Sequence, residues 1–156
     1  MARKEKRSFD KLRTNGVESV LLSRSVVEGL LSCARSAQPH EACGILLGKG
    51  NRITAFTPTA NVHLTPETHF EIDPQALIDA HRAEREGGLQ VLGYFHSHPN
   101  GTARPSETDA RMATGDGRIW AVGGCATKDG LEEPKVTLWR DLGDGFEPLS
   151  YTVIEE

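Results

Sequence analysis

Short apolar runs alternate with longer amphipathic ones along the chain. The apolar and alternating runs predict strands, over residues 17–22, 42–48, 52–56, 89–95, 118–123, 135–140 and 151–154. Runs with helical spacing predict helices, over about 25–38, 73–87 and 106–113. Because strands and helices interleave, the predicted class is α/β or α+β, with a mixed β-sheet flanked by helices.

Signals at the helix ends refine two of these predictions. Ser25 and Glu28 have the spacing of a capping box at the start of the first helix. The second helix begins with Asp73 as N-cap and Pro74 in its first turn, and a glycine pair at 87–88 ends it. The residues expected to face the core are Val26, Val27, Leu30, Leu31 and Ala34 in the first helix and Leu77, Ile78, Ala80 and His81 in the second.

The length of 156 residues suits a single domain with its own core, which we expect over residues 17–156. Residues 1–16 are charged and poor in apolar side chains, so they are predicted to be a disordered extension. A nucleic-acid-binding arm is the alternative for this segment, but Glu5 and Asp10 interrupt its basic run.

Composition narrows the classes of partner. A formal net charge of −4 gives no reason to expect nucleic acid, and neither a membrane-length apolar run nor a signal peptide is visible. Cys33, Cys43 and Cys125 are odd in number and unrelated in spacing, which is typical of reduced thiols in a cytoplasmic protein. The chain has no CxxC pair, which excludes a zinc ribbon.

Side chains that can bind a metal ion or take part in catalysis are most concentrated between His96 and Asp109, directly after an apolar strand. Alternation along that strand places His96 and His98 on one face, with Cα atoms about 6.6 Å apart, and Pro99 ends the strand behind them. The chain then turns and returns with the carboxylate of Asp109. Two imidazole nitrogens and one carboxylate oxygen, with a fourth position left to water, form the ligand set of a catalytic zinc ion.

A purely structural interpretation of these residues exists. Two histidines at a strand end are often ordinary polar side chains, and Ser106 with Asp109 also satisfies a helix capping box. A capping box requires no histidine pair ahead of it, however. The capping and metal-binding roles are also compatible, because a helix that starts at Ser106 carries Asp109 on its first turn.

Glu41, then His96-Ser97-His98-Pro99, then Pro105-Ser106-x-x-Asp109 resembles the JAMM motif of the MPN-domain metalloproteases. The resemblance covers roughly residue 17 to the C-terminus. Neighbouring segments are similar to the small prokaryotic branch of that family, at residues 41–44, 61–62, 70–74 and 92–95. The resemblance implies a single MPN-like α/β domain.

The resemblance also implies roles for five residues. His96, His98 and Asp109 would bind one zinc ion per chain, Glu41 would act as general acid and base, and Ser106 would support the tetrahedral intermediate. Zinc lowers the pKa of bound water from about 15.7 to about 7, which makes hydroxide available at neutral pH. A carboxylate can then carry a proton to the departing amine, and a hydroxyl can donate to the oxyanion.

The expected reaction is therefore cleavage of an amide or isopeptide bond by a zinc metallopeptidase. The resemblance points to substrates with the C-terminal Gly-Gly tail of a ubiquitin-like protein, which in bacteria are sulfur-carrier proteins or their adducts with cysteine or lysine. A non-catalytic MPN scaffold with a structural metal is the main alternative, although a structural site has no use for Glu41. Nucleobase deamination is disfavoured because the H-x-E and P-C-x-x-C signatures are absent.

Other candidate residues carry weaker signals. Cys43 lies near His40, a pairing that also occurs in cysteine hydrolases, but an apolar run favours a buried, inert thiol. His40, His63, His69 and His81 are expected to be surface groups, with substrate contact as the alternative.

Overall fold

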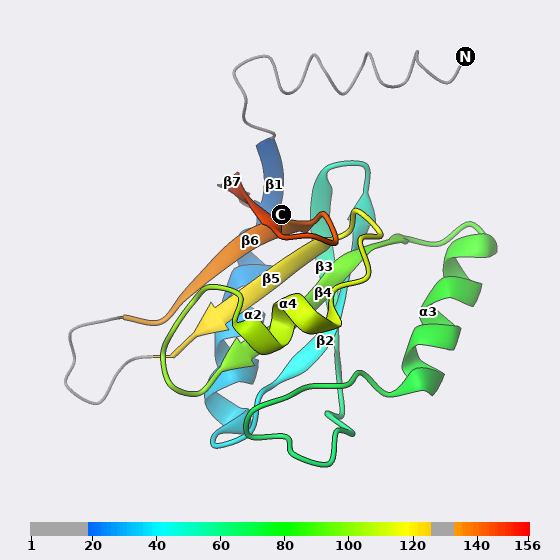
Figure 1. Ribbon diagram of the computed structural model, residues 1–156. Helices are drawn as coiled ribbons and strands as arrows, with labels where there is room; N and C mark the ends of the chain where they lie inside the picture. Colours follow the sequence, from blue (N-terminus) through cyan, green and yellow to red (C-terminus); the bar gives the residue numbers. More distant parts are fainter. Residues whose placement is uncertain (1–18, 126–132) are drawn as a thin grey trace.

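The computed structural model, described over residues 19–125 and 133–156, is built around one mixed sheet (Figure 1). Its hydrogen-bonded order is β1-β3-β2-β4-β5-β6-β7, and β7 pairs back onto β1, so the sheet curves until its ends meet. The strands are β1 Ser19–Ser23, β2 Cys43–Lys49, β3 Arg52–Thr59, β4 Gln90–His98, β5 Ile119–Gly124, β6 Lys135–Asp141 and β7 Phe146–Ile154. The predicted mixed sheet is confirmed. The extension predicted for residues 1–16 lies outside the described residues.

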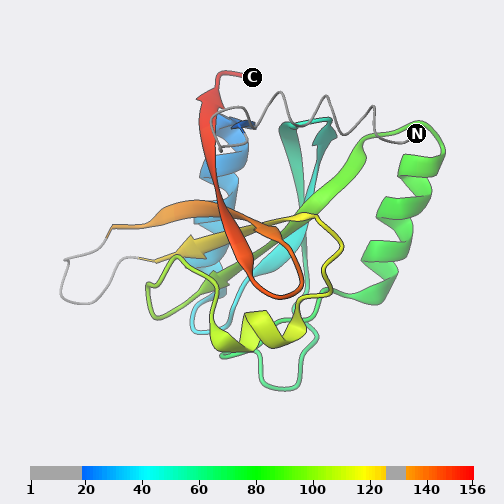
Figure 2. The same ribbon diagram turned by 45° about the horizontal axis from the view of Figure 1, so that its top comes forward.

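The helices of the described residues are α2 Arg24–Ala37, α3 Pro74–Arg85 and α4 Glu107–Met112. Figures 1 and 2 show α2 and α3 on opposite sides of the β2-β3-β4 part of the sheet. The short α4 lies close to the end of β4 that carries the histidines. Within the described part of the chain, no helix is long and apolar enough to cross a membrane.

Two apolar clusters fill the two faces of the sheet. One lies under α2 and includes Leu30, Leu46 and Phe95. The other lies under α3 and includes, among its buried members, Ile45, Phe70, Val91 and Trp120. Because side chains alternate along a strand, Phe95 enters the first cluster and the next residue, His96, faces the second. The histidine pair is thus held on a packed surface.

Three details of the sequence-based prediction are wrong. Helix α2 begins at Arg24 after β1, so the N-cap is Ser23 and the capping box predicted at Ser25 does not form. Ile78 is 50% exposed, and Ala76 joins Leu77 and Ala80 against the core instead. The last strand starts at Phe146 rather than residue 151, because Pro148, a poor strand former, hides the alternation there.

Candidate metal centre and active site

His96, His98 and Asp109 converge as the sequence predicts. The Nε2 atoms of the two histidines lie 3.2 Å apart, and Asp109 Oδ2 lies 2.9 Å from His96 Nε2 and 3.2 Å from His98 Nε2. Two ligands of a tetrahedral zinc ion with bonds of about 2.0–2.1 Å lie about 3.3 Å apart. The triangle therefore has the size and donor set of a zinc site. All three residues are buried.

Two local structures set this triangle. Strand β4 presents both imidazoles on one face at its last residues, as the alternation predicts. Helix α4 opens with a capping box in which Ser106 Oγ accepts from the N–H of Asp109, and Asp109 Oδ2 accepts from the N–H of Ser106 at 2.9 Å. The carboxylate oxygen that faces the histidines is therefore fixed by the same contacts that start the helix.

Backbone contacts also set the tautomer of His98. Its Nδ1 lies 2.8 Å from the carbonyl oxygen of Thr102. A carbonyl only accepts hydrogen bonds, so Nδ1 carries the proton and Nε2 keeps a lone pair directed at the triangle. Metal-binding histidines commonly donate a hydrogen bond from the N–H of their other ring nitrogen to a backbone carbonyl. The residues present fit a bound metal ion.

Burial and mutual contact shift the pKa values of all three groups. Burial opposes the charge on Asp109, but its close contacts with the ring nitrogens of His96 and His98 hold its pKa well below the ordinary range. Full burial lowers the pKa of His96. Burial also opposes protonation of His98, yet its contacts with Asp109 outweigh this effect and raise its pKa. Asp109 therefore stays a carboxylate, and His96 stays neutral, as metal ligands must.

Glu41 lies just before β2, beside this triangle. One ligand-type atom of Glu41, of His96 and of His98 lies within 4.8 Å of the others. The Glu41 side chain is buried, and its Oε1 has no hydrogen-bond partner among the described residues. Burial raises the pKa of Glu41 to about 7, while the charge on His98 opposes the shift and that on Asp109 adds to it. This carboxyl group exchanges a proton near neutral pH.

The backbone around Glu41 is joined firmly to β4. The N–H of Ala42 donates to Ser97 Oγ at 2.8 Å, and the N–H of Ser97 donates to the carbonyl of Ala42 at 3.1 Å. On its other side, the N–H of Glu41 donates to the carbonyl of Pro66 at 2.7 Å. Ser97, the residue between the two histidines, therefore sets the distance from Glu41 to them. Sequence reasoning assigned it no role.

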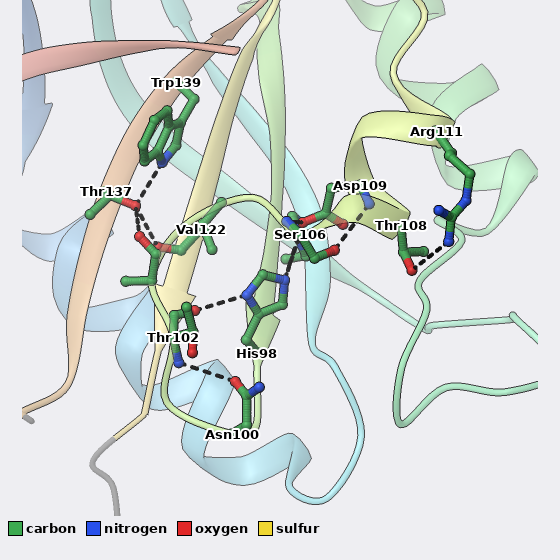
Figure 3. Close-up of polar contacts among 12 residues, drawn as sticks. His98, Asn100, Thr102, Ser106, Thr108, Asp109, Arg111, Val122, Thr137 and Trp139 are labelled. Carbon is green, nitrogen blue, oxygen red and sulfur yellow. Dashed lines mark hydrogen bonds and ion pairs between the residues drawn. The ribbon is translucent and has the colours of Figure 1, made fainter. Parts of the chain in front are cut away.

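The loop that joins β4 to α4 is anchored to the sheet. Thr137 Oγ1 donates to the carbonyl of Ala103 at 2.7 Å and accepts from Trp139 Nε1 at 2.9 Å. Figure 3 shows the contact between Thr137 and Trp139, and the His98–Thr102 pair on the neighbouring loop. A Cβ at Gly124 would lie 2.6 Å from the carbonyl oxygen of Gly101, so the close approach of the loop requires glycine there. Sequence reasoning missed Thr137 because a lone strand threonine carries no motif.

Aromatic rings orient His96. The ring of Phe70 stacks on the imidazole with centroids 4.4 Å apart and planes 12° apart, and Trp120 meets it edge-on at 5.6 Å. Nδ1 of His96 has no hydrogen-bond partner in the described residues. Packing, rather than a hydrogen bond, thus sets the ring plane of His96.

A cavity of about 700 Å³ opens over the site. Glu41, His98 and Ser106 line it together with residues of two loops: Glu67 and Thr68 on the β3–α3 connection, and Asn100, Thr102 and Arg104 on the β4–α4 loop. Ser106 Oγ accepts from Asp109, so its own hydrogen is available to a group in the cavity. The cavity is large enough for an extended peptide to reach Glu41.

The weaker candidates lie outside this arrangement. Cys43 Sγ faces Thr59 Oγ1 at 3.5 Å and the carbonyl of Ala60 at 3.6 Å, and burial raises the pKa of its thiol. His63 and His69 stack on each other at 4.6 Å in the β3–α3 connection. No hydrogen bond in the described residues joins Cys43 to a histidine, so the thiol is a buried group without a histidine base bonded to it.

Solved structures share this fold. A protein from Desulfitobacterium hafniense is 31% identical, with a TM-score of 0.75, over 88% of this chain and 94% of that one. A JAB1/MPN domain protein from Archaeoglobus fulgidus is 22% identical, with a TM-score of 0.55, over 87% of this chain and 97% of that one. The fold is therefore that of JAB1/MPN domains. Within this fold, the buried His-x-His, aspartate and glutamate lie together in the pattern that the JAMM motif predicts.

The family of prokaryotic homologs of the JAB domain matches residues 23–141, so the chain belongs to this family. It is 30% identical over 138 residues to a desampylase of Haloferax volcanii, covering 85% of this chain and 94% of that protein. It is 37% identical over 92 residues to a probable TtuB-protein conjugate cleaving protease of Thermus thermophilus, covering 56% and 62%. It is 30% identical over 105 residues to a CysO-cysteine peptidase of Mycobacterium tuberculosis, covering 66% and 71%.

Proposed function

We propose that this peptidase uses one zinc ion to hydrolyse the amide or isopeptide bond that follows the C-terminal Gly-Gly of a ubiquitin-like or sulfur-carrier protein. The observation that carries the proposal is the buried, unpaired carboxyl of Glu41 beside the His96–His98–Asp109 triangle. The names of the relatives, a desampylase, a TtuB-conjugate cleaving protease and a CysO-cysteine peptidase, support conjugates of small carrier proteins as the substrate class.

His96 Nε2, His98 Nε2 and Asp109 Oδ2 would hold the zinc ion. When bound, zinc activates water at neutral pH and polarises a carbonyl group. The spacing of the three atoms supports this ligand set. Because Glu41 also lies within ligand distance of the histidines, its role as a base rather than a fourth ligand is part of the proposal.

Glu41 would act as the general acid and base. Its carboxylate accepts a proton from the attacking water and then delivers that proton to the amine nitrogen, which amide cleavage requires. A pKa of about 7 suits both steps, since a group that titrates near the working pH both accepts and releases protons. A site that only held a structural metal would gain nothing from burying this carboxyl.

Ser106 would stabilise the oxyanion that develops on the scissile carbonyl. Its hydroxyl is fixed by the Asp109 N–H, lines the cavity and has its hydrogen free to donate. One such donor contributes about 3–4 kcal/mol to the transition state. Cys33, Cys43 and Cys125 are all free thiols, which suits the cytoplasm, where we propose that the reaction takes place.

The test uses a carrier protein whose Gly-Gly tail is joined to cysteine or to a lysine side chain. Intact-mass spectrometry should record release of the carrier with a free glycine carboxylate. Glu41→Gln keeps the shape of the side chain and removes the base, so zinc should stay bound while turnover falls by about 100-fold or more. Loss of zinc from this variant would instead make Glu41 a ligand. Wild-type protein with zinc but without cleavage would favour the scaffold alternative.

A further inference from the structure

Arg104 is the one lysine or arginine among the described residues that line the active-site cavity. Its side chain is exposed, and it takes part in no hydrogen bond or ion pair within the described residues. Arg118, by comparison, contacts Asp116 and the carbonyl of Val91. Arg104 therefore brings an unpaired guanidinium to the cavity that Glu41 also lines.

The backbone on both sides of Arg104 is fixed. Before it, the carbonyl of Thr102 accepts from His98, and the carbonyl of Ala103 accepts from Thr137. After it, the N–H of Ser106 is bound by Asp109. The position of the Arg104 backbone is thus set by the same contacts that set the site, and only its side chain is free to meet a ligand.

Distance and charge narrow the chemical class of the ligand that Arg104 would bind. Two residues of extended chain span at most about 7 Å, so the Arg104 backbone lies within that distance of the Ser106 backbone. The same cavity is lined by Glu67 and Glu41. A negatively charged group close to the scissile bond is repelled by these carboxylates and attracted to Arg104. A carboxylate matches the planar, two-pronged guanidinium.

We propose that Arg104 binds the α-carboxylate of the leaving amino acid, and that the enzyme therefore prefers a Gly-Gly tail joined to the α-amino group of one free amino acid. This inference rests on the proposed function. Hydrolysis adds water across the carbon–nitrogen bond, leaving a glycine carboxylate on the carrier and a free amino acid. In that leaving group one carbon separates the nitrogen from the carboxylate. In an isopeptide, the nitrogen lies at the end of a lysine side chain, with no carboxylate nearby.

The test compares leaving groups that differ only in charge. The carrier tail is extended by a single alanine, either as the free acid or as the carboxamide, and a third substrate carries the tail on the side chain of a blocked lysine. We expect kcat/KM to be roughly tenfold higher for the acid than for the carboxamide or the lysine substrate. Arg104→Gln should give equal kcat/KM values for the acid and the carboxamide. Arg104→Lys should give an intermediate ratio of these values, since it keeps the charge but loses the two-point hydrogen bonding of the guanidinium.

Arg111→Gln is the matched control, because it removes a positive charge from the adjacent helix, where Arg111 contacts Thr108 and does not line the cavity. Its acid-to-carboxamide ratio should equal that of the wild type. Equal wild-type rates on acid and carboxamide would overturn the inference while leaving the proposed function intact. An Arg104→Gln protein that slows both substrates alike would overturn it too.

Binding measurements separate the subsite from turnover. Fluorescent peptides that end in Gly-Gly-Ala, as acid or carboxamide, are titrated into the zinc-loaded Glu41→Gln protein and followed by anisotropy. Tighter binding of the acid peptide that is lost on adding Arg104→Gln supports the subsite. This holds even if the carrier substrates are not cleaved, because a lack of cleavage would count against the proposed function alone. Equal affinity for the two peptides would overturn the inference.

Discussion

The side-chain amide of Asn61 donates a hydrogen bond of 3.0 Å to the carbonyl oxygen of Glu41. It also donates to the carbonyl of His69 at 3.0 Å, while its oxygen accepts from the N–H groups of His63 and Glu71, both at 3.1 Å. One partly buried side chain thus closes the loop over residues 61–71 and ties it to the residue proposed as the base. Glu41 precedes β2, so no strand ladder holds its carbonyl.

Replacing Asn61 by Asp should damage both stability and catalysis. The substitution keeps the shape but turns a donor into an oxygen that faces the carbonyls of Glu41 and His69. We expect a loss of about 1–3 kcal/mol in the free energy of unfolding, measured in urea, because buried acceptors lose their partner. We also expect kcat to fall more than KM rises, since Glu41 shifts while the cavity walls remain.

Asn51→Asp is the matched control for this variant. Asn51 donates to a single carbonyl, that of Ser19, in the turn between β2 and β3, at the end of β2 that is away from Glu41. Its substitution should leave zinc content and kcat unchanged and cost less stability. Equal effects of the two substitutions would contradict the positioning role of Asn61.

The sequence was sufficient to predict the sheet, the helices and the meeting of His96, His98 and Asp109. That prediction succeeded because strand alternation and the capping box are local rules that act over a few residues. Glu41 came from the family resemblance, since nothing local marks a lone carboxylate ahead of a strand.

Contacts between distant segments could not be predicted in the same way. Asn61, Ser97 and Thr137 support the site through partners 20, 55 and 34 residues away in the chain. A single polar residue of this kind has no periodicity and no spacing rule. Its partner is known only once the sheet brings β2, β4 and β6 together.

Removing a proposed ligand should remove the metal. His96→Ala and Asp109→Ala each leave two of three protein ligands, so we expect metal affinity to fall by more than about 100-fold. The zinc content per chain is measured by inductively coupled plasma mass spectrometry after the protein has been passed over a weak chelator. About one zinc per chain is expected for the wild type. His81→Ala, on helix α3 and outside the ligand triangle, should keep full occupancy. Full occupancy in the His96→Ala protein would rule out this ligand set.

The raised pKa of Glu41 predicts how the metal-free protein responds to pH. Between the ordinary value of 4.5 and about 7, the folded protein holds a proton on Glu41 that the unfolded chain releases. The free energy of unfolding should therefore fall as pH rises through this window, by about 3 kcal/mol relative to the Glu41→Gln protein, which lacks the group. Urea titrations of both apo proteins at pH 4.5 and 7.5 measure the difference. Parallel pH profiles would contradict the burial effect.

Thr137→Val should loosen the β4–α4 loop without touching the metal ligands. The variant keeps the volume of the side chain but loses the donor to Ala103 and the acceptor for Trp139. We expect a loss of about 1–3 kcal/mol in the free energy of unfolding and a several-fold drop in kcat/KM. Thr152→Val, at an exposed position of β7, is the control and should change neither quantity. An unchanged kcat/KM in Thr137→Val would mean that the loop position does not matter.

The cavity walls predict strict selection for glycine in the substrate tail. Thr68 on one loop and Thr102 and Arg104 on the other line the cavity together with Glu41 and Ser106. A tail that places its scissile carbonyl at Ser106, as proposed, therefore lies beside these loops. Glycine lets the two backbones approach closely, whereas a β-branched side chain would separate the carbonyl from Ser106. Replacing the penultimate glycine of the tail by valine should therefore reduce kcat/KM steeply, by about 100-fold when positioning is lost. The same replacement several residues upstream should matter much less, and equal rates for the two substrates would favour a hydrolase of short, unrelated peptides.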